Sequence, residues 1–123
     1  MTAERRLTDL TDVALITCIV QRGLGDKIVR AAVEAGAHGA TVYFARGTGV
    51  RERLGVLGIA VEVEKEIVDI VVADDQVDRI FERMYLAGGL DTPGMGFMYI
   101  TPLEKAATYV PPEVLERLTK GGS

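Results

Sequence analysis

Short apolar runs alternate along this chain with stretches in which apolar residues recur every three or four positions. The runs are rich in β-branched residues, which is typical of buried strands. They predict four strands, at Ala14–Val20, Ala40–Ala45, Ile67–Ala73 and Phe97–Thr101.

Two amphipathic helices are predicted between these strands. In the first, Ile28, Val29, Ala32 and Val33 keep helical spacing, and Gly36 stands where a left-handed terminal cap belongs. The second is predicted after Asp74 and Asp75, which are good N-cap residues, and it ends at Gly88. Its apolar stripe comprises Val77, Ile80, Phe81, Met84 and Tyr85. A short terminal helix can open at Pro111 and Pro112.

This order of elements predicts an α+β fold of the ferredoxin-like βαββαβ type. In that fold a four-stranded antiparallel sheet carries two helices on one face. The strands are nevertheless apolar on both faces, as Leu15–Val20 shows. An exposed Val or Ile forfeits roughly 1.5–3 kcal/mol, so we expect the second face to be buried against copies of the same chain. An N-terminal segment folded across that face is the alternative.

The apolar pattern changes phase between residues 59 and 72. Ile59, Val61 and Val63 hold odd positions, whereas beyond Lys65 the apolar residues Val68, Ile70 and Val72 hold even ones. A shift of one residue turns every side chain to the opposite face of a sheet. The pattern therefore predicts a bulge, a twist or a separate arm near Glu64–Glu66.

Composition and charge narrow the class of protein. The chain has 123 residues, which is the length of one domain, and 48% of them are hydrophobic. A net charge of -4 argues against a nucleic-acid-binding protein, which normally has a basic face. The single cysteine, Cys18, excludes an internal disulfide and is expected in the core. We find neither a signal peptide nor a membrane-spanning run, and expect a cytoplasmic protein with a reduced thiol.

Three segments of the chain carry a resemblance to a known family. They are "AGAHGATVYFARGTG", "EIVDIVVADDQVD" and "AGGLDTPGMGFMYI". In order and length of elements the chain resembles the PII nitrogen-regulatory signal-transduction proteins, small trimeric regulators of nitrogen and carbon metabolism, as a divergent PII-like member. The resemblance implies one domain over residues 1–123, with an N-terminal extension (1–12), a T-loop-like arm (46–66) and a C-terminal segment (102–123). It also implies a homotrimer.

The family binds adenine nucleotides between subunits, so the resemblance implies ATP, ADP or AMP as ligand and no permanent cofactor. Glycines suit phosphate because their backbone N–H groups can approach its oxygens closely. The positions that match the family's nucleotide site are Thr41, Arg46, Gly47, Thr48, Gly49, Val71, Gly94, Met95, Gly96 and Lys105. Met95 stands in the loop where the family has a phosphate-binding lysine, and Arg46, Arg51 and Lys105 are the candidates to replace its charge.

The family senses 2-oxoglutarate through a magnesium ion that a glutamine helps to hold. Arg51 stands at that position here, and an arginine side chain only donates hydrogen bonds. The residue therefore argues against magnesium-dependent sensing of the usual kind, although Arg51 can pair directly with a carboxylate or phosphate.

The segment 47–66 matches the family's target-binding loop and implies a partner such as a membrane transporter or a metabolic enzyme. The residues expected to contact it are Arg51, Arg53, Leu54, Val56 and Leu57. No tyrosine occurs between Gly47 and Ala73, so we expect an arm that works without nucleotidylation. A solvated turn is the other interpretation of this segment.

Two other classes of function remain open from the sequence. One is a trimeric cation-tolerance-type metal-binding protein of the same fold, with Glu64, Glu66 and His38 as candidate ligands. A solvated strand face is the ordinary interpretation of Glu62, Glu64 and Glu66, and a loop position that of His38. The other class is an enzyme subunit. No nucleophile, base and orienting group can be assembled near a glycine loop, so we expect no catalysis.

Overall fold

The computed structural model describes residues 7–47 and 63–114 of the chain. Its main element is a four-stranded antiparallel sheet in the order β3-β4-β2-β5. The strands are β2 (Val13–Gln21), β3 (Thr41–Gly47), β4 (Val63–Ala73) and β5 (Gly96–Leu103). Each of the four predicted strands is present, and each is longer than its apolar run suggests.

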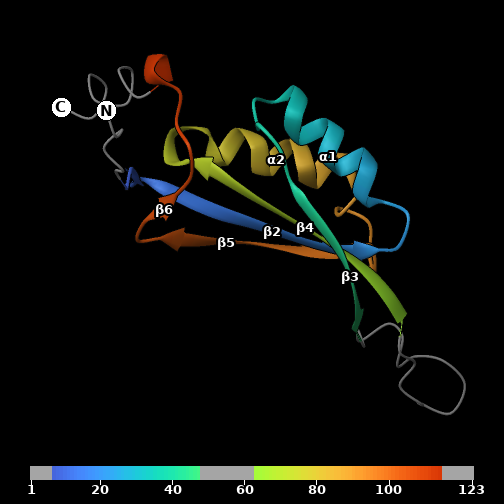
Figure 1. Ribbon diagram of the computed structural model, residues 1–123. Coiled ribbons are helices and arrows are strands. Elements are labelled where there is room, and N and C mark those ends of the chain that lie inside the picture. The colour runs from blue at the N-terminus through green and yellow to red at the C-terminus, as the bar shows by residue number, and fades with distance from the viewer. Residues whose placement is uncertain (1–6, 48–62, 115–123) are drawn as a thin grey trace, which may run out of the picture.

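Two helices cover one face of this sheet, as Figure 1 shows. They are α1 (Gly25–Glu34) and α2 (Val77–Ala87), and a short 3-10 helix, η3 (Asp74–Gln76), precedes the second. The architecture confirms the predicted α+β ferredoxin-like fold. Gly36 follows α1 with a φ of +122°, as expected of a left-handed cap residue.

The hydrophobic core lies between the helices and the even-numbered positions of β2 and β4. The side chains of Ile16, Val68 and Ile70 are almost completely buried there. Against them pack the buried residues of the two helical stripes, namely Ile28, Ala32, Val77, Ile80 and Met84. For the second helix, the predicted stripe is thus confirmed in the core at Val77, Ile80 and Met84. Tyr85, in contrast, is 36% exposed.

A second, two-stranded sheet joins the segment before β2 to the segment after β5. It pairs β1 (Asp9–Leu10) with β6 (Ala106–Ala107), and neither strand was predicted. Residues 7–12 leave Val71 and Phe97 on the uncovered sheet face exposed, so this part of the N-terminal segment does not bury that face. Residues 112–114 are helical, in agreement with a terminal helix that opens at the proline pair.

Of the three alternatives predicted near Glu64–Glu66, a bulge, a twist or a separate arm, the bulge is wrong. Pairing of β4 with β3 runs without interruption from Val63 opposite Gly47 to Asp69 opposite Thr41. The apolar pattern changes phase because Glu66 occupies a core-facing position, where it is only 7% exposed. The predicted solvated face therefore fails for Glu66, while Glu64 is exposed and Glu62 lies outside the described residues.

A local set of polar contacts explains why Glu66 is buried. The backbone N–H of Gly23 donates a hydrogen bond to its Oε1. A Cβ added to Gly25, the first residue of α1, would lie 2.1 Å from Oε2, so the carboxylate sits against the start of the helix. The positive end of the helix dipole stabilises a carboxylate there.

The predicted side-chain caps of the second helix are also wrong. Asp74 and Asp75 lie inside η3, and the N-cap residue of α2, Gln76, makes no side-chain capping hydrogen bond. The backbone N–H of Asp74 instead donates to the carbonyl of Asp12. The chain thus enters α2 through a tighter turn that its own backbone bonds stabilise.

Candidate functional site

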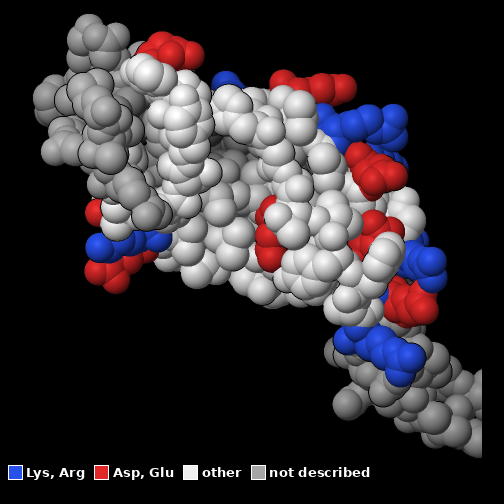
Figure 2. Space-filling view, in the orientation of Figure 1, with Lys and Arg blue, Asp and Glu red and all other residues white. Residues whose placement is uncertain are grey.

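Within residues 7–47 and 63–114, one face of the four-stranded sheet carries no helix, and we call it the open face. It comprises the odd-numbered positions of the four strands, in register across the sheet. Large apolar and aromatic side chains are exposed on it: Val71 by 50%, Phe97 by 63%, Tyr99 by 41% and Tyr43 by 43%. Figure 2 shows a broad surface over the strands with few charged side chains, while Lys and Arg gather toward the ends of the molecule.

Two of the predicted phosphate-binding segments lie at the same end of the sheet. Gly47 ends β3, and the loop before β5 carries Gly94 and Gly96. The side chain of Gln21 on β2 donates a hydrogen bond of 3.4 Å to the Gly94 carbonyl. However, β3 and β5 are the two outer strands, so three strand spacings separate the two segments, a total of about 14 Å. One copy of the chain does not bring them together.

The loop before β5 needs its glycines for two different reasons. Gly94 has a φ of +82°, a conformation that residues with a side chain rarely adopt. At Gly96 an added Cβ would come within 2.5 Å of the Ile19 carbonyl oxygen, so the neighbouring strand excludes a side chain. Met95 between them is half-buried. The glycines that resemble a ligand loop are therefore also required by the fold.

The other predicted nucleotide-binding residues are spread along the sheet. Thr41 begins β3 and pairs with Asp69, and Val71 follows two positions later on the same face of β4. Lys105 lies beyond the far end of β5, about 25 Å from its start, and its Nζ is 4.0 Å from Asp9. The structure thus places Thr41 near Val71 but separates Lys105 from the glycine loop. Thr48, Gly49, Arg51, Arg53, Leu54, Val56 and Leu57 lie outside the described residues.

Sequence reasoning missed a basic residue beside Gly47. Lys65 stands on β4 opposite Ala45, and its aliphatic carbons lie 3.4–3.6 Å from the point where a Cβ of Gly47 would be. Lys65 lies between Glu64 and Glu66 in the sequence, in the stretch interpreted as a solvated strand face. Only the pairing of β3 with β4 shows that the Lys65 side chain lies beside Gly47, at the predicted phosphate turn.

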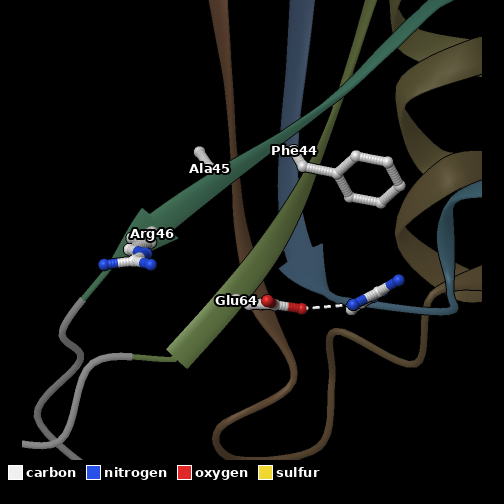
Figure 3. Close-up of a pocket in the computed structure, with 5 residues that line it drawn as sticks. Phe44, Ala45, Arg46 and Glu64 are labelled. Carbon is white, nitrogen blue, oxygen red and sulfur yellow. Dashed lines mark hydrogen bonds and ion pairs between the residues drawn. The ribbon is translucent and has the colours of Figure 1, made fainter.

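A shallow pocket of about 330 Å³ lies on the opposite side of the same strand ends, lined by Arg22, Phe44, Ala45, Arg46 and Glu64. The guanidinium of Arg22 forms an ion pair with Glu64 at 2.5 Å and lies 5.3 Å from the centre of the Phe44 ring. Figure 3 shows Arg46 at the end of β3, next to the strand that carries Glu64. Of the predicted nucleotide-binding residues only Arg46 lines this pocket, so it does not coincide with the expected site.

The described residues contain no ready metal centre. Across 7–47 and 63–114, no three His, Cys, Asp or Glu side chains lie close enough to hold an ion. Of the candidate ligands, Glu64 pairs with Arg22, Glu66 accepts a hydrogen bond from the N–H of Gly23, and His38 is exposed. In the same residues no helix has the length and apolar character needed to span a membrane.

Comparison with known proteins agrees with this architecture. Residues 13–111 match the family described as "Nitrogen regulatory protein P-II", which is most of the chain. A crystal structure of Arabidopsis thaliana PII bound to citrate has the same fold, with a TM-score of 0.60 and 22% sequence identity over 76% of this chain and 79% of that one. This chain therefore belongs to the P-II family, whose members are signalling regulators.

Proposed function

We propose that this protein is a homotrimeric PII-type regulator that binds an adenine nucleotide at the boundary between subunits and contacts a target protein through the 47–66 segment. The observation that carries the proposal is the position of the two glycine segments. Gly47 and Gly94 lie at the same end of the sheet but at its opposite edges. Two copies placed edge to edge can bring one segment of each to a shared site.

The charge near Gly47 supports an anionic ligand. Arg46 and Lys65 come from adjacent strands at the sheet end that carries Gly47. Cations beside exposed backbone N–H groups bind phosphate or carboxylate oxygens. Lys65, which lies on the same face of the sheet as Gly47, would then supply the charge that Met95 does not, whereas Arg46 points to the other face. The citrate in the Arabidopsis thaliana structure shows that a polyanion can bind a protein of this fold.

Thr41 and Val71 supply the other half of the proposed site. Thr41 is exposed at the start of β3, and Val71 is half-exposed on the open face nearby. A hydroxyl next to an apolar surface suits a nucleobase, which has polar edges and flat apolar faces. The nucleotide-binding residues proposed here are therefore Thr41, Gly47, Lys65, Val71 and the loop 94–96. The proposed targets are those that the family resemblance implies, a membrane transporter or a metabolic enzyme.

Replacing Gly47 tests the nucleotide site without disturbing the fold. The nearest atoms to a Cβ at this position are Lys65 carbons at 3.4 and 3.6 Å, which is ordinary contact. Gly47→Val should fold and assemble as the wild type does, but its side chain would fill the space needed by phosphate. We expect calorimetry with ATP, ADP and AMP to show at least a tenfold loss of affinity, which is about 1.4 kcal/mol.

Gly39→Val is the matched control, because a Cβ at Gly39 meets no atom within 4 Å. It precedes the same strand and should leave nucleotide binding unchanged. Normal binding by Gly47→Val would place the site elsewhere. A wild-type protein that binds none of the three nucleotides would contradict the proposed ligand class.

A further inference from the structure

The pocket on the helix side of the strand ends forms where two strands continue past their neighbour. β2 ends at Gln21, opposite Lys65, whereas β3 and β4 stay paired as far as Gly47 and Val63. Phe44 lies near this end of β3, on the face that the helices cover elsewhere, and it is 67% exposed. Its ring therefore offers a ligand apolar contact area that the core does not use.

An ion pair lies beside the ring, and both of its groups can accept a further partner. The guanidinium of Arg22 lies 5.3 Å from the centre of the Phe44 ring, and its Nη1 donates to Oε2 of Glu64 at 2.5 Å (Figure 3). Within residues 7–47 and 63–114, the other guanidinium nitrogens and Oε1 of Glu64 make no hydrogen bond. The two side chains are 63% and 60% exposed, so these atoms are accessible.

This charge pair distinguishes ligands by their charge. An anion that approaches Arg22 is repelled by Glu64, and a cation that approaches Glu64 is repelled by Arg22. A zwitterion can lie antiparallel to the ion pair, so that each of its charges meets the opposite one. Its carboxylate can accept two parallel hydrogen bonds from a guanidinium. Arg46 also lines the pocket and adds a positive charge, so the carboxylate is the more strongly attracted end.

The size of the pocket limits the ligand further. Its volume of about 330 Å³ is at the lower end of the range of about 300–1,000 Å³ for small-molecule sites. A zwitterionic head group with one apolar substituent fits such a space, and the substituent would cover the Phe44 ring.

We propose that this pocket binds free α-amino acids that have an apolar side chain. The α-carboxylate pairs with Arg22, the α-ammonium group with Glu64, and the side chain packs on Phe44. The site is separate from the proposed nucleotide site, because Gly47 and Lys65 lie on the other face of the same strands. The inference goes beyond the proposed function and does not depend on it.

Three matched probes test the charge requirement. Heteronuclear NMR would follow the backbone amides of the full chain, without nucleotide, as L-leucine, N-acetyl-L-leucine or L-leucinamide is added. L-leucine should shift the signals of Arg22, Phe44 and Ala45 with a dissociation constant of the order of 1 mM, as expected of an exposed site. The acetylated probe lacks the ammonium group and the amide lacks the carboxylate, so each should bind at least tenfold more weakly.

Substitutions test the position of the site. Arg22→Gln and Phe44→Ser change exposed side chains and should leave the fold intact, but each should weaken L-leucine binding about tenfold. Arg83→Gln, at an exposed position of α2, is the matched control and should bind as the wild type does.

Each contrary outcome overturns the inference. Absence of shifts with L-leucine would show that the pocket does not bind this class of ligand. Equal binding of N-acetyl-L-leucine would show a general anion site instead. Shifts confined to the open face, or normal binding by Arg22→Gln, would place the ligand elsewhere. None of these results bears on the nucleotide site, which calorimetry with ATP, ADP and AMP tests independently.

Discussion

The two faces of the sheet differ in what buries them. On the helix-covered face Ile16, Cys18 and Val68 are fully buried by elements of the same chain. On the open face, residues of similar character such as Val71 and Phe97 stay exposed by 50% and 63%. Hydrophobicity alone therefore does not distinguish the two faces. What distinguishes them is whether the chain itself supplies a layer to cover them.

Two carboxylates on β4 show that the faces also differ in how polar groups are hydrogen-bonded. Glu66 faces the helices, and its carboxylate is held by Gly23 and the start of α1. Asp69 faces the other way and finds a partner for only one of its oxygens. The Glu66 carboxylate on the covered face thus has a partner, whereas one oxygen of Asp69 on the open face has none within the described residues. Incomplete satisfaction in the described residues thus coincides with the face that lacks a covering layer.

The same substitution, valine to alanine, at Val68 and at Val71 should show the largest difference in stability between the two faces. Both lie on β4, but Val68 is fully buried and Val71 is half-exposed on the open face. Val68→Ala should lower the free energy of unfolding by about 2–3 kcal/mol, because it removes buried methyl groups and leaves a cavity. Urea unfolding should show this loss equally at every protein concentration.

Val71→Ala should instead act through assembly. For the separate chain its cost should stay within about 0.5 kcal/mol, as expected for a surface position. Any larger loss should grow with protein concentration, because it reflects contact with another copy. Equal and concentration-independent losses for the two variants would mean that the faces do not differ as described.

Gly25 and Glu66 test how the covered face accommodates a charge. Gly25→Ala places a Cβ where Glu66 Oε2 lies and should displace the carboxylate. We expect a loss of about 1–2 kcal/mol in the free energy of unfolding, because the Gly23 N–H loses its partner. In the Glu66→Ala background the same change should be neutral or stabilising by up to about 1 kcal/mol, since alanine favours a helix over glycine. Additive effects in urea unfolding would contradict this contact.

Cys18 offers a pH-dependent test of the same face. Burial raises the pKa of its thiol from 9.0 to about 12. The folded protein therefore keeps the thiol proton over a range in which the unfolded chain releases it. Stability should be constant below pH 9 as far as this group is concerned, and should fall by about 1.4 kcal/mol per pH unit between pH 9 and 12.

Cys18→Ala should remove this part of the alkaline slope. Urea unfolding between pH 7 and 11 would compare the two proteins. A constant offset caused by the smaller side chain is expected at all pH values and does not affect the slope. Parallel curves above pH 9 would show that the thiol is accessible to solvent in the folded state.

The sequence by itself determined the order of elements, because apolar periodicity is a local property that reports which side chains can share a face. It predicted the strands, both helices and the left-handed residue at Gly36. It also predicted that two helices could not cover all the apolar strand positions. The family resemblance came from contiguous segments, and the match over residues 13–111 confirms it.

Only the tertiary structure decided the role of residues whose partners are distant in sequence. Glu66 looked like a solvated residue, yet the start of α1 lies beside it and makes its burial favourable. Lys65 became a neighbour of Gly47 through strand pairing, and Lys105 was separated from the glycine loop by the length of β5. The Tyr43–Asp69 bond joins residues 26 positions apart. Such contacts depend on register and sheet order, which local propensities do not encode.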